Sequence, residues 1–117
     1  MMKTENIILD KSFKFSLKII SLYKILKAEW EYVLSKQLLR SGTSIWANVY
    51  EATASPTKKD FINKMSIASK ESRETMYWLK LLQESDLTYH DCTNYLVDVE
   101  EIMKIITAIT KTAQANI

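Results

Sequence analysis

The sequence contains one histidine and one cysteine, and only Asp91 separates them. An imidazole, a carboxylate and a thiolate are all accepted zinc ligands, so His90, Asp91 and Cys92 are the first residues to consider for chemistry. Three ligands within one helical turn make a poor site, and a histidine at a capped helix start is typical of an exposed side chain. We therefore predict no metal and no cofactor.

Nucleophilic catalysis would need Cys92 or a serine beside a histidine base, but His90 faces elsewhere on the same predicted helix. Di-iron bundles use Glu-x-x-His pairs, and the residue three before His90 is Leu87. With a single glycine there is no Gly-rich phosphate loop. The sequence predicts a protein that is not an enzyme and has no small-molecule substrate, although a cleft with converging carboxylates would revive catalysis.

Basic side chains with one interleaved aromatic recur between residues 58 and 80, a pattern that could hold a phosphate backbone. The candidate nucleic-acid-binding residues are Lys58, Lys59, Lys64, Lys70, Arg73, Tyr77 and Lys80. The alternative is a solvated face of mixed charge, in which Lys70 pairs with Glu74 one turn away. The net charge of +2 argues only weakly for nucleic acid, because a basic segment (1–30) and an acidic one (85–117) can attract each other.

The elements that must position these residues are helices, because one glycine and one proline are too few for the turns of a sheet. Apolar residues recur at spacings of three and four, as in Phe15, Ile19, Leu22 and Leu26. We predict helices over about 10–28, 31–53, 58–84 and 89–113. The expected fold is all-α, an antiparallel up-down-up-down four-helix bundle in one domain covering 1–117.

Local signals refine these boundaries. Pro56 ends the second helix, and Thr57 with Asp60 forms a capping-box pattern that opens the third. Thr88 with Asp91 gives the same pattern before the fourth, with Leu87 and Cys92 placed as a hydrophobic staple. In the first helix three further apolar residues are expected to widen the core-facing side, namely Phe13, Leu17 and Ile20.

Gly42 lies inside the second predicted helix, where glycine costs about 1 kcal/mol relative to alanine. Its presence predicts the close approach of another element. We expect that element to be the third helix, which has small residues at its centre, namely Ala68, Ser72 and Thr75.

Several large side chains fall outside the expected core, and such residues are enriched at protein interfaces. We interpret them as a self-association surface; the alternative is a wide core whose aromatics lie over the bundle edge. A polar stripe on the second helix could be plain surface or a hydrogen-bonding seam between subunits. The candidate oligomer-interface residues are Leu39, Arg40, Ser44, Trp46, Asn48, Tyr50, Glu51, Ile67 and Trp78.

A resemblance to a known family covers residues 6–109. It rests on three stretches: ENIILDKSFKFSLKIISLYKIL, LLRSGTSIWANVYEA and KKDFINKMSIASKESRETMYWLKLL. Together they resemble the bacterial four-helix-bundle family of 23S rRNA intervening-sequence proteins. The matching motif positions are Arg40, Ser41, Ser44, Asn48, Glu51, Lys59, Asp60, Lys70, Glu71, Arg73 and Glu74. Trp46 departs from the pattern, because the family usually has a small residue there.

The resemblance implies an up-down bundle that assembles as a ring of five subunits. Related accessory variability proteins of retroelements form basic rings associated with nucleic acid and a reverse transcriptase. We therefore expect a homo-oligomeric, pentameric scaffold that binds RNA or DNA, and the alternative is a protein-binding adaptor without nucleic-acid activity. Short apolar runs and a lone cysteine predict a cytoplasmic protein without membrane attachment.

Overall fold

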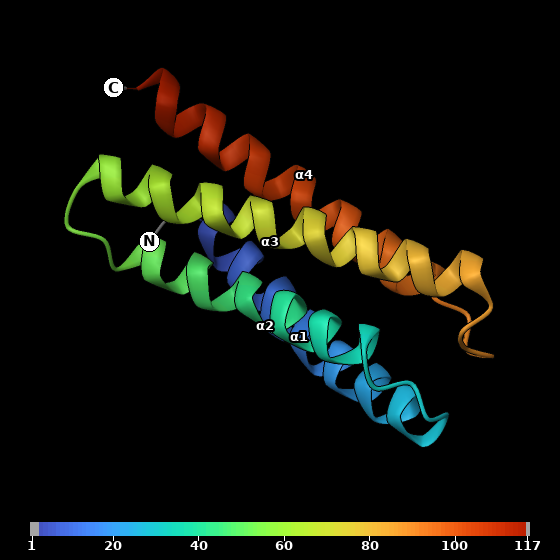
Figure 1. Cartoon of the computed structure of the whole chain (residues 1–117). Coiled ribbons are helices and arrows are strands. Elements are labelled where there is room, and N and C mark those ends of the chain that lie inside the picture. Colours follow the sequence, from blue (N-terminus) through green and yellow to red (C-terminus); the bar gives the residue numbers. More distant parts are fainter. Residues whose placement is uncertain (1–2, 117) are drawn as a thin grey trace.

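The computed structural model describes residues 3–116 and consists of four α-helices. They are α1 (Lys3–Ala28), α2 (Leu34–Thr53), α3 (Lys58–Ser85) and α4 (Thr93–Ala115). Each helix turns back along the one before it, and the bundle measures 47 × 20 × 20 Å (Figure 1). Helices α1 and α3 each pack on both α2 and α4. The predicted all-α four-helix bundle is confirmed.

One hydrophobic core runs through the centre of the bundle. Phe15, Ile19, Leu22 and Leu26 are buried on α1, as their spacing predicted. The other helices contribute residues at the same three- and four-residue spacing, among them Leu38, Ile45, Val49, Met65, Leu79, Leu82, Val99, Ile102 and Ile106. No helix within residues 3–116 combines the length and the apolar character that a membrane span requires.

Helix α1 departs from the prediction in two ways. It begins at Lys3 instead of near residue 10, because buried Ile8 extends the core-facing stripe toward the N-terminus. The expectation that Phe13, Leu17 and Ile20 widen the core is wrong: their exposed fractions are 51%, 52% and 37%. These three side chains lie on a separate face of α1, away from its buried stripe.

Helix α2 begins at Leu34 instead of residue 31, and the residue at the predicted start acts as a cap. The Glu31 carboxylate accepts hydrogen bonds from the backbone N–H groups of Val33, Leu34 and Ser35 at 3.1, 2.9 and 2.7 Å. The first backbone N–H groups of a helix have no partner within the helix itself, so an acceptor placed there stabilises the helix start.

Helix α4 begins at Thr93, so the predicted start at 89 is also wrong. The Thr88 hydroxyl accepts from the His90 N–H at 3.0 Å, and the Asp91 carboxylate accepts from the Thr93 N–H at 3.0 Å. The two residues therefore organise the link before α4 instead of forming the expected capping box. Of the capping box expected at α3, the hydrogen bond to the side chain of the first residue is present: the Thr57 hydroxyl accepts from the Asp60 N–H at 3.1 Å.

Gly42 provides the close approach that its position predicted, but to a different helix. A Cβ atom at Gly42 would lie 2.9 Å from both Cγ atoms of Ile19 on α1. The neighbouring residue Ser41 is the one that faces α3, where the Thr75 hydroxyl donates to its Oγ at 2.8 Å. The expected pairing of Gly42 with the small residues of α3 is therefore corrected to α1.

Candidate functional site

The residues around Cys92 build the link between α3 and α4. Cys92 is fully buried, and burial, together with the charges of Asp91 and Glu29, raises the pKa of its thiol to about 11. A thiol with this pKa is protonated at neutral pH and is a poor nucleophile. His90 Nε2 lies 3.4 Å from the Tyr95 hydroxyl. In the described part of the chain, no three His, Cys, Asp or Glu side chains gather as metal ligands.

An exposed apolar surface spans α1 and α2, and we call it the apolar band. Its residues are Phe13, Leu17, Ile20, Trp46 and Tyr50. Trp46 links the two helices, because its ring meets the edge of Phe13 at 5.9 Å between centroids and stacks on Tyr50 at 4.9 Å. The band combines rigid aromatic rings with half-exposed aliphatic side chains, the composition of many protein interfaces.

Only part of the predicted oligomer interface lies in this band. Trp46 and Tyr50 belong to it, whereas Leu39 and Trp78 are partly buried against the core of their own chain and Ile67 is partly buried on α3. Sequence reasoning assigned the three α1 members of the band to the core. The signal that could have identified them is their own spacing of four and three, which defines a second apolar stripe on α1.

The polar stripe of α2 finds partners within the chain. The Ser44 hydroxyl donates to the Arg40 carbonyl at 2.5 Å, and the Asn48 amide donates to the Ser44 carbonyl at 2.9 Å. Glu51 pairs with Lys64 of α3 at 3.1 Å. These contacts of the stripe thus lie within the chain, along α2 and toward α3, and a hydrogen-bonding seam between subunits stays a prediction.

Arg40 bridges α2 to two carboxylates of α3. Its guanidinium lies 3.2 Å from Glu71 and 2.5 Å from Glu74. The hydrogen bond to Glu74 and the charge of Glu71 raise the pKa of Arg40, against an opposing effect of burial. The Glu71 side chain is almost buried, so the pair acts mainly in holding α2 against α3. Glu74 is therefore engaged with Arg40 instead of forming the expected pair with Lys70.

A basic groove runs between α3 and α4 on the other side of the bundle. It has a volume of about 330 Å³, and we call it the α3–α4 groove; its lining residues are Ser66, Ser69, Lys70, Arg73, Thr107, Thr110, Lys111 and Gln114. An adjoining hollow shares Arg73, Thr107 and Lys111 and adds Lys104. Within residues 3–116, Lys70, Arg73 and Lys111 form no ion pair, while Lys104 pairs with Glu100 at 3.5 Å.

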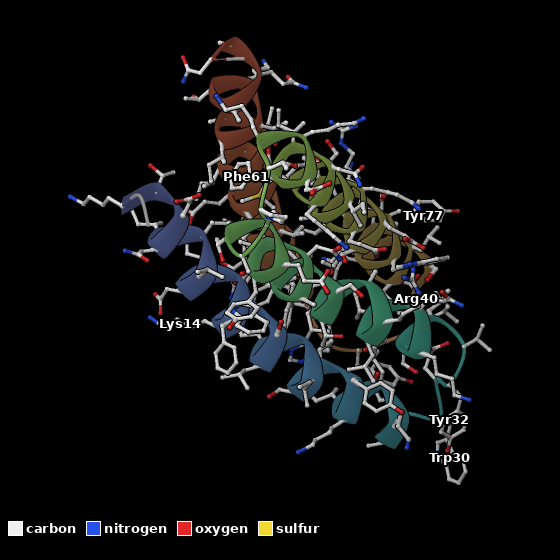
Figure 2. The ribbon with its side chains drawn as sticks, turned by 90° about the vertical axis from the view of Figure 1, so that its left-hand side faces the viewer. Lys14, Trp30, Tyr32, Arg40, Phe61 and Tyr77 are labelled. Carbon is white, nitrogen blue, oxygen red and sulfur yellow. The ribbon has the colours of Figure 1, made fainter. Side chains whose placement is uncertain are left out.

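The predicted nucleic-acid residues divide between this groove and other places. Lys70 and Arg73 line the groove, and Tyr77 and Lys80 are exposed further along α3, where Tyr77 projects into solvent away from Lys14 of α1 (Figure 2). Lys58 and Lys59 are exposed at the start of α3. Lys64 faces α2 through its ion pair with Glu51.

The α4 half of the groove, with Lys111, Thr107 and Thr110, was missed by sequence reasoning. Nothing in the spacing of these residues marks them, because the surrounding segment is acidic overall. Only the packing of α4 on α3 brings Lys111 beside Lys70 and Arg73.

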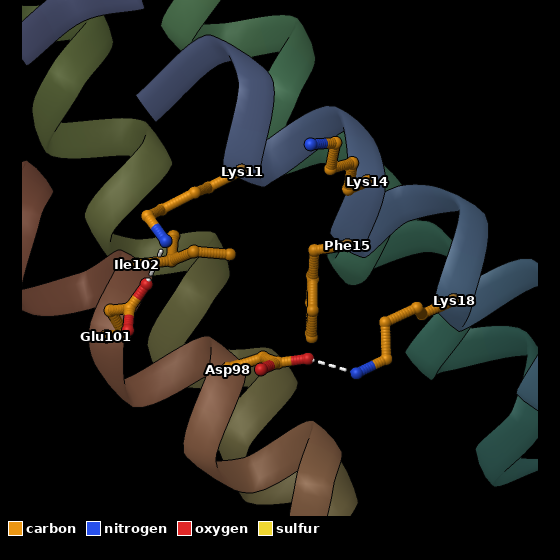
Figure 3. A pocket seen from close by; sticks show the side chains of 7 residues that line it. All are labelled: Lys11, Lys14, Phe15, Lys18, Asp98, Glu101 and Ile102. Carbon is orange, nitrogen blue, oxygen red and sulfur yellow. Dashed lines mark hydrogen bonds and ion pairs between the residues drawn. The ribbon is translucent and has the colours of Figure 1, made fainter. Parts of the chain in front are cut away.

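Other basic residues, on α1, meet acidic residues of α4. Ion pairs between Lys11 and Glu101, at 2.5 Å, and between Lys18 and Asp98 span a hollow floored by Phe15 (Figure 3). The hydrogen bond to Glu101 raises the pKa of Lys11. The attraction expected between the basic first segment and the acidic last segment is therefore present, and these carboxylates of α4 are engaged with α1 instead of with the α3–α4 groove.

The fold and its surfaces define a small all-α four-helix-bundle protein with an apolar face and a basic face. The chain belongs to the 23S rRNA-intervening sequence protein family, whose model matches residues 4–108. It is also similar to a crystal structure of a protein of unknown function from the S23 ribosomal protein family of Bacteroides thetaiotaomicron VPI-5482. The two chains are 44% identical over 92% of this chain and 98% of the other, with a TM-score of 0.88. No curated protein sequence gave a significant match. The predicted family membership is confirmed.

Proposed function

We propose that this protein is a homo-oligomeric helical scaffold that binds RNA or DNA through the exposed basic side of α3 and α4. The observation that carries this proposal is the group of three cations, Lys70, Arg73 and Lys111, that line one groove without a carboxylate partner in the described chain. Unpaired cations attract a polyanion, because its binding releases condensed counterions.

The apolar band supports the homo-oligomeric part of the proposal. Phe13, Leu17 and Tyr50 are each about half exposed, and burying such surface contributes roughly 25 cal/mol per Å². Self-association through α1 and α2 would cover the band while leaving α3 and α4 open to solvent, since the two surfaces lie on different helix pairs. A subunit number of five rests on the family resemblance.

Light scattering coupled to size-exclusion chromatography tests the assembly. We expect the native protein to elute with a mass several times the 13.6 kDa of one chain, and Leu17→Glu to elute at 13.6 kDa, because a charge in the band opposes its burial. Val97→Glu is the matched control, since Val97 is an exposed aliphatic residue on α4 outside the band. A native protein that is monomeric at micromolar concentration would contradict the assembly.

Fluorescence anisotropy with labelled RNA and DNA tests the nucleic-acid part. We expect binding that weakens steeply with salt, and the double variant Lys70→Gln/Arg73→Gln should lower the log–log salt slope by roughly 1 for each phosphate that it no longer binds. The control is Lys14→Gln/Lys24→Gln, which removes the same charge from exposed positions on α1. If neither RNA nor DNA binds at low salt, the proposal fails and the protein-binding adaptor becomes the better explanation.

A further inference from the structure

The geometry points to single-stranded RNA as the ligand of the α3–α4 groove, a deeper assignment that rests on the proposed function. The width of the groove limits what can enter it. Two packed helices lie about 8–10 Å apart between their axes, so their facing side chains interdigitate and only a shallow valley remains along the seam. A single sugar–phosphate chain can follow this valley, whereas a duplex could touch only its outer rim. The lining residues of this groove come from both walls, so a ligand that contacts them all must enter the valley.

The wall formed by α3 offers hydrogen-bond donors. Lys70 and Arg73 are cationic and unpaired among the described residues, and the hydroxyls of Ser66 and Ser69 donate to no described residue. Phosphate oxygens are acceptors only, so they are the matching groups on a nucleic acid. The backbone phosphates therefore lie along this wall, with Lys111 of the opposite wall as the third cation of the groove.

The wall formed by α4 offers acceptors in addition to the cation of Lys111. The Thr107 hydroxyl donates its hydrogen to the Met103 carbonyl at 2.8 Å, and the Thr110 hydroxyl donates to the Ile106 carbonyl at 2.9 Å. With these hydrogens directed at the backbone, the two hydroxyl oxygens are left to accept a hydrogen bond from a ligand in the groove. A ribose 2′-hydroxyl can donate such a bond and deoxyribose cannot, so this wall distinguishes RNA from DNA.

Tyr77 extends the site beyond the groove. It lies one helical turn past Arg73, its side chain is 55% exposed, and its ring is supported by Trp78 at 5.0 Å between centroids. An exposed ring next to a phosphate track stacks on an unpaired base, which a duplex does not present. From Lys70 to Tyr77 the site spans about 10 Å, enough for roughly two or three nucleotides.

The test compares four labelled oligonucleotides of one sequence on the native protein: single-stranded RNA, its 2′-O-methyl form, single-stranded DNA and duplex RNA. We expect single-stranded RNA to bind roughly 3- to 10-fold more tightly than its 2′-O-methyl form and DNA, the effect of one or two hydrogen bonds. It should also bind more tightly than duplex RNA, which keeps its 2′-hydroxyls but presents no unpaired base to Tyr77. Thr107→Val/Thr110→Val should lower RNA affinity to that of DNA and leave DNA affinity unchanged. Thr112→Val, at an exposed position on α4 outside the groove, is the matched control.

The outcomes separate the two proposals. Equal affinity for RNA and DNA, tighter binding of the duplex or of DNA, or an RNA preference that survives in Thr107→Val/Thr110→Val would overturn the assignment while nucleic-acid binding itself stands. Because the oligonucleotide series uses the native protein, it remains decisive if the double variant does not fold. Absence of binding to all four oligonucleotides would overturn the proposed function as well.

Discussion

Gly42 is the residue at which helix propensity and packing oppose each other. Alanine would gain about 1 kcal/mol in propensity within α2, but its Cβ would lie 2.9 Å from two atoms of Ile19 and 3.3 Å from a third. Because the Cβ of Ile19 is attached to its backbone, the clash cannot be relieved by the side-chain tip alone. We expect Gly42→Ala to lower the free energy of unfolding by about 1–3 kcal/mol in urea denaturation.

Removing the opposing atoms should reverse this effect. Ile19→Ala deletes both Cγ atoms, so adding Gly42→Ala to that variant should be neutral or stabilising, and a double-mutant cycle measures the difference. If Gly42→Ala stabilised the otherwise native protein, the close packing of α1 on α2 at this point would be refuted.

Cys92 makes stability depend on alkaline pH. Its folded-state pKa of about 11 lies above the unfolded value of roughly 8.5. Below pH ~8.5 both states keep the proton and stability is unaffected; between about 8.5 and 11 the unfolded state loses it first, so the free energy of unfolding falls as pH rises. Iodoacetamide should therefore alkylate the native thiol far more slowly than the urea-unfolded thiol at pH ~8.5. Equal rates would contradict the burial of this side chain.

At the scale of helices, the sequence predicted interiors better than ends. The three- and four-residue spacing identified Phe15, Ile19, Leu22 and Leu26 correctly, because a core stripe follows from helix geometry alone. The starts of α2 and α4 depended on which side chain accepts from which backbone N–H. Glu31 and Thr88 make those contacts in the folded links, and Thr88 also bonds to Glu29 of another link, which no local pattern encodes.

Glu31 should therefore contribute more to stability than an ordinary surface glutamate. Glu31→Ala removes the acceptor of three backbone N–H groups at the start of α2, and we expect a loss of about 1–2 kcal/mol. Hydrogen exchange should accelerate at the amides of Leu34 and Ser35. Glu84→Ala, at an exposed position near the end of α3, is the control and should change stability little. Unchanged exchange at Leu34 and Ser35 would show that the cap does not form in solution.

For the whole molecule, the candidate site was predictable on one helix only. Lys70, Arg73 and Tyr77 were visible in the sequence as a basic run with an aromatic, whereas Lys111 became part of the site through the packing of α4 on α3. The apolar band was half visible for the same reason: Trp46 marked α2, and the spacing of Phe13, Leu17 and Ile20 marked a second stripe on α1. Which of the two apolar stripes of α1 faces the core is set by the orientation of that helix in the bundle. Surfaces shared by two helices depend on tertiary packing, which spacing within one helix does not determine.

The two surfaces together predict that assembly and nucleic-acid affinity are linked only for long strands. The band and the groove lie on different helix pairs, so Leu17→Glu should leave each groove intact while separating the subunits.

A strand of about six nucleotides reaches one groove and should bind native protein and Leu17→Glu equally. A strand of about 40 nucleotides reaches several grooves of one assembly, and the avidity it gains, on the order of 100-fold or more, should be lost in Leu17→Glu. Anisotropy titrations of both strands against both proteins measure this, with Val97→Glu as the control. If Leu17→Glu lost as much affinity for the short strand as for the long one, the substitution would disturb the groove itself. If it lost no affinity for the long strand, the grooves of an assembly would not share one ligand.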